Sequence, residues 1–349
     1  MMANITNLPS VEILVRCDGS PQLGLGHIVR CLALATELRD TFNMRLGFLT
    51  LNNDIGAEII EQHCFPCFIK PIELDEAEWI DALIREIAPK AIILDVRTQL
   101  AASALQLWRD AGITVAVIDD PSDRRKAADL AFYPPVPQLD DVDWHGFTGE
   151  AFVGWDYILL KKAFSLPLPR PKNRMPVLLV TMGGSDPGGL TLLALNALRQ
   201  LDQEFCAKVV LGKAFLHNEA LDRMLPELSD NFEILRNVTE MPSLMAGCDL
   251  AIAAFGGTAY ELAALKVPSI LLGYTTDHAR SAEALDRAGM AISMGVYHQI
   301  SPPNLAARVR SLLEDAPRRL GMSLACKALD GLGAQRISRI ILERIGSHV

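Results

Sequence analysis

The feature that most restricts the fold is an alternation of short apolar runs with longer segments of helical periodicity. Apolar runs in the first half have the length of a buried strand and cover residues 11–17, 44–50, 91–95, 113–118 and 129–133. Residues 26–40 place apolar side chains at helical spacing, so this segment presents one face to a sheet. Strands that alternate with helices predict an α/β fold with a parallel sheet.

The same rhythm returns in the second half, with strands predicted at 177–182, 206–211, 232–235, 249–253, 269–272 and 290–294. A chain of 349 residues exceeds the length of about 250–300 residues at which one core stops growing, so two domains are expected. A proline-rich basic stretch separates the two series. We therefore predict an N-terminal domain over 1–165, a linker over 166–176, a C-terminal domain over 177–332, and a last helix over 333–349 that can pack back on the first domain.

Charge and composition disfavour several classes of protein. The 33 Lys and Arg residues against 42 Asp and Glu residues give a net charge of −9, which argues against broad binding to nucleic acid or to an anionic membrane. Charged or turn residues interrupt each apolar stretch before the length of about 18 residues that a membrane helix needs. The N-terminus lacks the pattern of a secretory signal, and the 7 cysteines are scattered. We expect a cytoplasmic protein with reduced thiols and no transmembrane segment.

The first candidate site follows the first strand, where Gly24 and Gly26 open the helix that carries His27 and Arg30. Such a loop exposes backbone N–H groups at the positive end of a helix. An imidazole there can take a proton from water, although His27 can also serve only as a local cap. Asp18 can orient His27 or cap the turn, and Arg30 can be an ion-pair partner or a surface charge. The third glycine of a dinucleotide fingerprint is missing, which disfavours an NAD enzyme.

The second candidate site is the glycine-rich loop over 183–189, which contains Gly183, Gly184 and Ser185 between a strand and a helix. Its position suits a phosphate, but it lacks the Lys-Ser/Thr ending of an ATP-binding P-loop. The alternative is a plain turn in which Asp186 caps the following helix. Both interpretations remain open from the sequence.

A third candidate site begins another helix with Gly257 and Thr258, and Glu261 follows one turn later. The helix start can hold a pyrophosphate, while Glu261 can accept hydrogen bonds from ribose hydroxyls. Glu261 alone is more typical of an ordinary first-turn acid that complements a helix dipole.

Other polar residues carry weaker signals. Asp95, Arg97 and Asp120 follow strands and so lie where ligands collect in open α/β sheets, or else they form ordinary turns. The run Arg124–Lys126 is interpreted as a solvated charge run. The pair Cys64 and Cys67 has zinc-ligand spacing without a second pair, so we predict no metal site.

Several segments together resemble the PseG/SpsG family, the UDP-sugar hydrolases of pseudaminic acid biosynthesis. The resemblance lies in VRCDGSPQLGLGHIVRCLALA, MGGSDPGGLT, GWDYILLKKAF and AIAAFGGTAYELAALKVPSILL. The last segment contains a GG-T-x-x-E element that also resembles MurG-like glycosyltransferases. The resemblance implies a GT-B fold, in which two Rossmann-like domains with parallel sheets face a central cleft that holds the active site.

The resemblance further implies an activity that needs neither metal nor cofactor. Its substrate would be a UDP-linked 2,4-diacetamido-2,4,6-trideoxy sugar, hydrolysed at the anomeric carbon with inversion and release of UDP. By the same resemblance, His27 would be the general base, Gly257 and Thr258 would contact phosphate, and Glu261 would bind ribose.

Two positions depart from the family pattern. Asp277 and His278 stand where an Asn-Gln pair is usual, and Asp95-Val96-Arg97 stands where Asp-His-Tyr is usual. Arg97 and His278 would suit a differently charged substrate. Two alternatives therefore stay open: a glycosyltransferase that uses a UDP-sugar, peripheral to the membrane if its acceptor is a lipid, or a nucleotide-sugar-binding protein without turnover.

Overall fold

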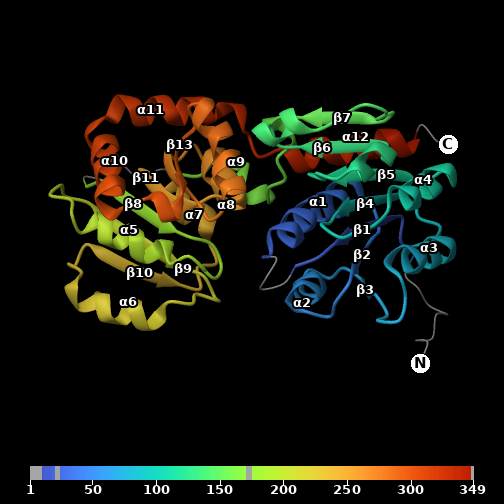
Figure 1. Cartoon of the computed structure of the whole chain (residues 1–349), viewed down its shortest axis with the longest axis horizontal. Coiled ribbons are helices and arrows are strands. Elements are labelled where there is room, and N and C mark those ends of the chain that lie inside the picture. The colour runs from blue at the N-terminus through green and yellow to red at the C-terminus, as the bar shows by residue number, and fades with distance from the viewer. Residues whose placement is uncertain (1–9, 20–23, 170–174, 347–349) are drawn as a thin grey trace. The chain divides into compact units, whose positions relative to one another are not determined.

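The computed structural model describes residues 10–19, 24–169 and 175–346 (Figure 1), so part of the loop before His27 and part of the predicted linker lie outside the described residues. The chain forms two compact units. The first unit consists of Met1–Pro135, Asp141–Lys162 and Leu332–Val349, and the second of Val136–Asp140 and Ala163–Gly331. The structure differs from the expected boundaries at Val136–Asp140, which belongs to the second unit although it lies inside 1–165.

The first unit is built on a parallel sheet whose seven described strands have the order β3-β2-β1-β4-β5-β6-β7. The strands are β1 Ile13–Cys17, β2 Leu46–Thr50, β3 Cys67–Ile69, β4 Ala91–Asp95, β5 Thr114–Ile118, β6 Leu130–Tyr133 and β7 Glu150–Val153. The strand order reverses direction at β1 and β4, and the register pairs Cys17 with Asp95 at their carboxyl ends. Ligands bind at such a switch point in open α/β sheets.

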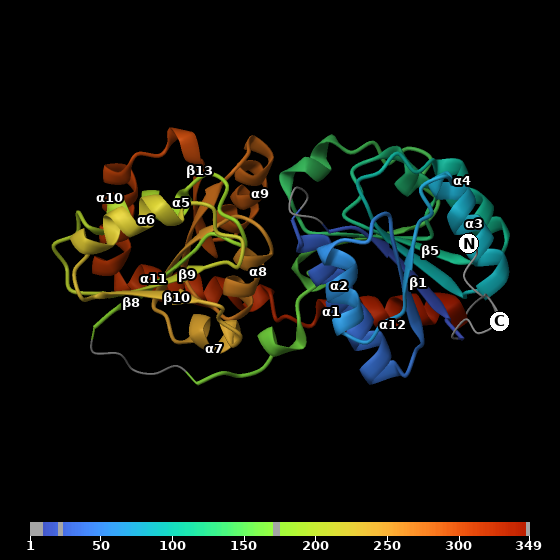
Figure 2. The same cartoon turned by 90° about the horizontal axis from the view of Figure 1, so that it is seen from below.

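Helices cover both faces of this sheet because their apolar stripes bury against it. They are α1 Gly26–Phe42, α2 Ile55–Gln62, α3 Glu76–Ile87, α4 Ala102–Asp110 and α12 Gly333–Gly346, with short 3₁₀ turns at Asp123–Ala127 and Trp155–Tyr157. A further 3₁₀ turn, Lys162–Phe164, lies where the chain passes from the first unit to the second. The last helix, α12, lies beside α1 (Figure 2) and adds Ile337, Ile341 and Ile345 to the core of the first unit.

The second unit repeats the design with six described parallel strands in the order β10-β9-β8-β11-β12-β13. These are β8 Val177–Thr181, β9 Cys206–Leu211, β10 Phe232–Arg236, β11 Leu250–Ala254, β12 Ser269–Gly273 and β13 Ala291–Val296. Its helices are α5 Leu190–Leu198, α6 Asn218–Met224, α7 Met241–Ala246, α8 Gly257–Ala264, α9 Thr276–Arg287, α10 Pro302–Glu314 and α11 Ala316–Ala325. Further 3₁₀ turns lie at Pro137–Asp141, Leu225–Glu227, Tyr297–Gln299 and Cys326–Ala328.

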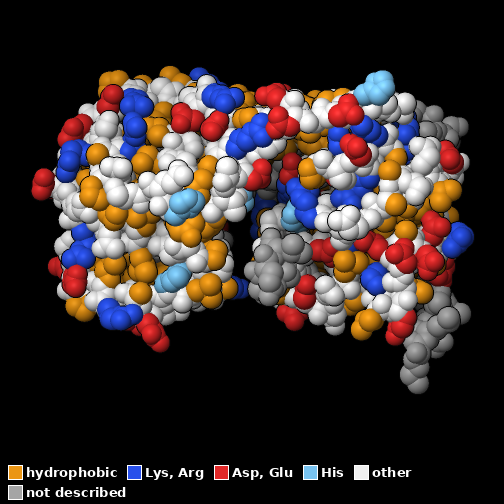
Figure 3. All heavy atoms as spheres, viewed as in Figure 1, with side chains coloured by type: hydrophobic (Ala, Val, Ile, Leu, Met, Phe, Trp, Pro, Cys, Tyr) orange, Lys and Arg blue, Asp and Glu red, His pale blue; other side chains and the backbone are white. Residues whose placement is uncertain are grey.

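The predicted fold class of two Rossmann-like parallel sheets is confirmed. The sequence reasoning missed β3 and β7, which are the two edge strands of the first sheet. Both are short and incompletely buried, so neither shows the continuous apolar run of a central strand. Within the part of the chain that the structure describes, no helix combines the length and apolarity needed to cross a membrane. Acidic and basic side chains are interspersed over the face drawn in Figure 3.

Candidate functional site

The most chemically distinctive cluster lies at the carboxyl ends of β1, β4 and β5 in the first unit. His27 is the second residue of α1, and the loop before it turns through Gly24, whose φ of 79° is a left-handed conformation that favours glycine. Leu25 precedes the helix and gives it no side-chain cap, and the first turn of a helix has backbone N–H groups without partners inside the helix. The loop therefore delivers an imidazole to a helix start at the switch point of the sheet.

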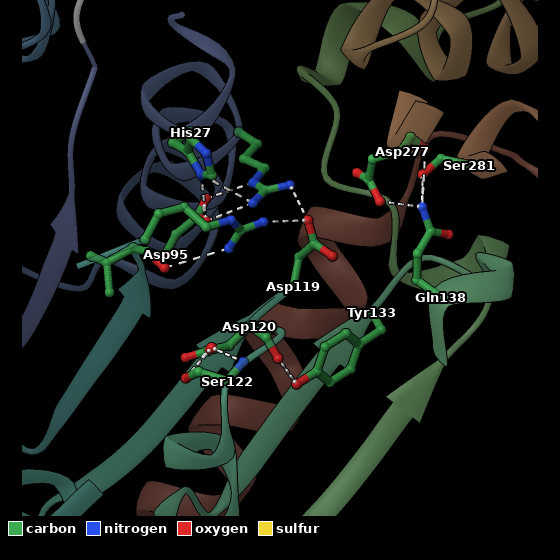
Figure 4. A network of polar contacts seen from close by, with 12 residues as sticks. His27, Asp95, Asp119, Asp120, Ser122, Tyr133, Gln138, Asp277 and Ser281 are labelled. Carbon is green, nitrogen blue, oxygen red and sulfur yellow. Dashed lines mark hydrogen bonds and ion pairs between the residues drawn. The ribbon is translucent and has the colours of Figure 1, made fainter. Parts of the chain in front are cut away.

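Asp95 at the end of β4 orients the His27 ring. Its Oδ1 lies 2.7 Å from Nδ1 of His27, and the two side chains point toward one another (Figure 4). The carboxylate is fully buried, whereas the imidazole is 20% exposed. A carboxylate oxygen at this distance requires a proton on Nδ1, which leaves the lone pair of the neutral ring on Nε2. Nε2 has no hydrogen-bond partner among the described residues, so it is the basic atom of the pair.

Arg30 completes this pair from the next turn of α1. Its Nε and one terminal nitrogen donate to the two oxygens of Asp95 at 2.5 and 2.6 Å. Burial alone would raise the pKa of Asp95, but the charge and hydrogen bonds of Arg30, together with the bond to His27, hold that pKa well below its ordinary value. Asp95 is therefore an ionised, immobile partner for the imidazole.

Asp119 and Arg97 extend the cluster toward solvent. Asp119 Oδ2 accepts from Arg30 at 3.2 Å and from Arg97 at 3.1 Å (Figure 4). Asp119 directly follows β5 with a φ of 51°, a left-handed conformation that is uncommon for a residue other than glycine. From the sequence, Asp119 stood out only as the neighbour of Asp120 after a strand, where a ligand contact and an ordinary turn were equally open.

Two predicted roles in this region need correction. Asp18 does not orient His27: one oxygen forms an ion pair with Arg16 at 2.8 Å, and the other accepts from the backbone N–H of Leu51 at 2.9 Å. Asp18 therefore ties the end of β1 to the chain after β2. The residue that orients His27 is instead Asp95, which was expected to contact the substrate.

Asp120 is also occupied within the protein rather than presented to a ligand. Its carboxylate is buried and accepts from Arg124 at 2.5 Å and from the backbone and hydroxyl of Ser122 at 2.9 and 2.7 Å. The prediction of a solvated Arg124–Lys126 run was wrong, because Arg124 and Arg125 are buried. Arg124 also donates to the carbonyl oxygens of Val96, Thr98 and Leu100.

In the second unit, Asp186 fills the N-terminus of α5. Its two oxygens accept from the backbone N–H groups of Leu190 and Thr191, each at 2.8 Å, and the Tyr274 hydroxyl lies 2.9 Å from Oδ1. The alternative of a turn capped by Asp186 therefore describes this helix start. The preceding Gly183 and Gly184 are exposed, so their backbone remains reachable by a ligand.

The start of α8 is free of such a cap. Gly256 precedes the helix without a side-chain hydrogen bond, and no acidic residue stands in the first turn. Gly257 is exposed and Thr258 is half-buried, with Glu261 one turn further along the helix. An uncapped helix start with a small, exposed first residue suits an anion such as a diphosphate.

The two departures at Asp277 and His278 lie in the first turn of α9. Asp277 is held by Gln138, whose amide nitrogen lies 2.8 Å from Asp277 Oδ1 and 2.7 Å from the Ser281 hydroxyl (Figure 4). The His278 ring packs near Phe255 and Tyr274, with ring centroids 6.0 and 6.4 Å apart. Burial lowers the pKa of His278, although the charge of Asp277 opposes this shift. Sequence reasoning missed Gln138, which no motif marks.

Among the described residues, which include Cys64 and Cys67, no three or more His, Cys, Asp or Glu side chains are grouped so that they could hold a metal ion.

The chain is similar in sequence and in fold to several known proteins. No protein-family model matches the chain. It is similar to the spore coat polysaccharide biosynthesis protein SpsG of Bacillus subtilis, with 26% identity over 347 residues, covering 95% of this chain and 98% of that protein. An uncharacterized protein of Methanocaldococcus jannaschii shares 29% identity with this chain over 276 residues, which are 75% of this chain. The chain spans only 55% of the length of that protein.

Among solved structures, MurG of Acinetobacter baumannii is similar in fold, with a TM-score of 0.72. The match has 14% identity and covers 95% of this chain and 99% of that chain.

Proposed function

We propose that the chain is a nucleotide-sugar hydrolase, from its similarity to SpsG over 95% of its length and its similarity in fold to MurG. The proposed substrate is a UDP-linked 2,4-diacetamido-2,4,6-trideoxy sugar, cleaved to the free sugar and UDP in nonulosonic (pseudaminic) acid biosynthesis. The observation that carries the proposal is the buried Asp95 bound to Nδ1 of His27, whose side chain is 20% exposed. This pair presents a basic nitrogen that has no partner among the described residues, at a place where ligands bind in such sheets.

In the proposed reaction, His27 Nε2 accepts a proton from water as the water oxygen bonds to the anomeric carbon. The bond between that carbon and the β-phosphate oxygen breaks, and its electron pair leaves with UDP. Attack opposite the leaving group inverts the anomeric configuration. Asp95 stabilises the imidazolium that forms, and Arg30 holds Asp95 in place.

The second unit supplies the nucleotide contacts in this proposal. The open N-terminus of α8 at Gly257 and Thr258 receives the diphosphate, and Glu261 accepts hydrogen bonds from ribose hydroxyls. The exposed loop at Gly183, Gly184 and Ser185 offers further backbone donors. Preorganised N–H groups stabilise the negative charge of the leaving diphosphate without a protonated acid.

A glycosyltransferase is the second candidate, favoured by the similarity in fold to MurG. The same imidazole would then remove a proton from an acceptor hydroxyl instead of water. The two candidates differ in whether the release of UDP needs an acceptor.

The test is incubation with a panel of UDP-sugars that includes a UDP-linked 2,4-diacetamido-2,4,6-trideoxy sugar, with and without acceptors, followed by NMR of the products. Release of UDP without acceptor, with an inverted anomeric centre, is the expected result. We expect His27→Ala to lower the rate of release by about 10²–10⁴-fold, the usual contribution of a general base. His63→Ala is the matched control, because His63 is an exposed residue after α2.

Release of UDP only with an acceptor would favour the glycosyltransferase. Binding of UDP-sugars without any turnover would favour a nucleotide-sugar-binding protein. An unchanged rate in His27→Ala would remove His27 as the base.

A further inference from the structure

The polar cluster around His27 is electrically balanced. It contains two guanidinium groups, Arg30 and Arg97, and two carboxylates, Asp95 and Asp119. Arg30 uses both oxygens of Asp95 and also reaches Asp119, so its charge is compensated inside the protein. Asp119 is the only described carboxylate that contacts Arg97. With a neutral His27, the formal charges of the four residues cancel.

Arg97 is the outermost member of this cluster and its least occupied donor. One terminal nitrogen donates to Asp119 at 3.1 Å, and the other lies 3.4 Å from the carbonyl oxygen of Val96. The side chain is 37% exposed, and a guanidinium carries five N–H groups. Within the described part of the chain, its other N–H groups have no protein acceptor. Arg97 can therefore donate hydrogen bonds to a ligand, although Asp119 already compensates its positive charge.

This balance decides what kind of ligand group the cluster favours. A hydroxyl or an amide carbonyl would accept a hydrogen bond from Arg97 and leave the charges balanced. A carboxylate would add a negative charge close to Asp119, and like charges at short distance repel strongly where solvent is partly excluded. A ligand carboxylate would also compete with Asp119 for Arg97.

We propose that Arg97 and Asp119 form a specificity-determining pair that selects nucleotide-sugars with an uncharged sugar and rejects those with an anionic sugar. The inference rests on the proposed function and assigns to two residues the selection of an uncharged sugar. It also revises the interpretation that an arginine at this position suits a differently charged substrate, because Asp119 neutralises the arginine.

The test compares the binding of UDP-glucose and UDP-glucuronate by isothermal titration calorimetry. These probes share the nucleotide and differ by a hydroxymethyl group against a carboxylate. We expect wild type to bind UDP-glucuronate no more tightly than UDP-glucose. In Asp119→Asn, the affinity ratio should move toward UDP-glucuronate by about tenfold or more, the value of one charge-assisted hydrogen bond. Asparagine tolerates the left-handed backbone of Asp119, so this variant preserves the local conformation.

Two further variants test whether the change in the affinity ratio comes from the unpaired charge of Arg97. The double variant Arg97→Gln with Asp119→Asn should return the ratio to the wild-type value, because the unmatched charge is gone. Asp40→Asn removes an equal charge from the same helix as His27 and should leave the ratio unchanged. Asp40 lies 13 residues along α1, about 20 Å away at 1.5 Å per residue, beyond the screening length of about 8–10 Å.

The outcomes separate the inference from the proposed function. Binding of both nucleotide-sugars with the same ratio in wild type and Asp119→Asn would overturn the specificity role. Tighter binding of UDP-glucuronate by wild type would overturn it as well. Failure of wild type to bind UDP or either nucleotide-sugar would overturn the proposed function, and this inference with it.

Discussion

Asp95 has the most demanding environment of the candidate site residues, because it is a charged group with no exposed surface. Removing a carboxylate from water is costly unless ion pairs and hydrogen bonds compensate it. Arg30 and His27 provide that compensation, and the Cys31 thiol lies 3.5 Å from the second oxygen. The same contacts that fix the charge of Asp95 also fix the tautomer of His27. Stability and chemistry therefore depend on one side chain.

We predict that Asp95→Asn lowers the free energy of unfolding by about 3 kcal/mol at pH 7, the low end for breaking a buried ion pair because Arg30 is 25% exposed. The folded state lowers the pKa of Asp95, so its stabilisation is complete above the unfolded value of about 3.9 and is lost as the pH falls through the lower folded value. The difference between wild type and variant should thus shrink below pH ~4.

Urea denaturation followed by circular dichroism between pH 7 and pH 3 measures this difference. Asp110→Asn, which removes an exposed carboxylate, is the control and should change stability little at any of these pH values. A difference for Asp95→Asn that stays constant down to pH 3 would contradict the coupling to Arg30.

At the scale of elements, α12 is held by a very close approach of two backbones. A Cβ atom added to Gly333, the first residue of α12, would lie 2.1 Å from the carbonyl oxygen of Ile158. The approach brings Ile337 and Ile341 into the core of the first unit. Because Gly333 has no side chain, α12 can pack this close to the backbone of Ile158.

We predict that Gly333→Ala lowers the free energy of unfolding by about 2 kcal/mol or more, because backbone atoms must move to admit the methyl group. Gly321→Ala is the matched control inside α11, where an added Cβ meets no atom within 4 Å. That variant should raise the free energy of unfolding by about 0.5–1 kcal/mol, since alanine favours a helix over glycine. Chemical denaturation of both variants measures the contrast, and equal effects would refute it.

At the scale of the whole molecule, each unit has its own hydrophobic core, and the first core draws on both halves of the sequence. Ile337, Ile341 and Ile345 of α12 join a core otherwise formed before the second unit begins. The core of the second unit lies between Leu178 and Met322. Loss of the last helix should therefore affect the unit that contains the opposite end of the sequence.

A chain that stops at Gly331 tests this arrangement. We expect the first unit to lose its cooperative unfolding transition and to bind the dye ANS, because the α12 side of its core becomes exposed. The second unit should keep a transition of its own. A chain that stops at Gly346 retains α12 and should unfold as the full chain does. A single unchanged transition in the shorter chain would contradict the independent cores.

The sequence predicted strands well where both faces are covered by helices and less well elsewhere. Residues 91–95 match β4 residue for residue, because a central parallel strand is buried on both faces and is apolar here up to its last residue, Asp95. The sequence could not show that Asp95 meets His27, since the two are separated by 68 positions and are joined by the pairing of β1 with β4. The nearby Asp18 looked the better partner. Burial of Arg124 was equally hidden, because it depends on carbonyl groups of a distant turn.

The contribution of α12 to the first unit has a consequence for synthesis on the ribosome. Residues 333–346 are made after the whole of the second unit, so the earlier half must wait for its final helix while the later half can already fold. During that interval the α12-binding face of α1 is uncovered. A nascent chain of this design would depend on chaperones that shield apolar surface until translation is almost complete.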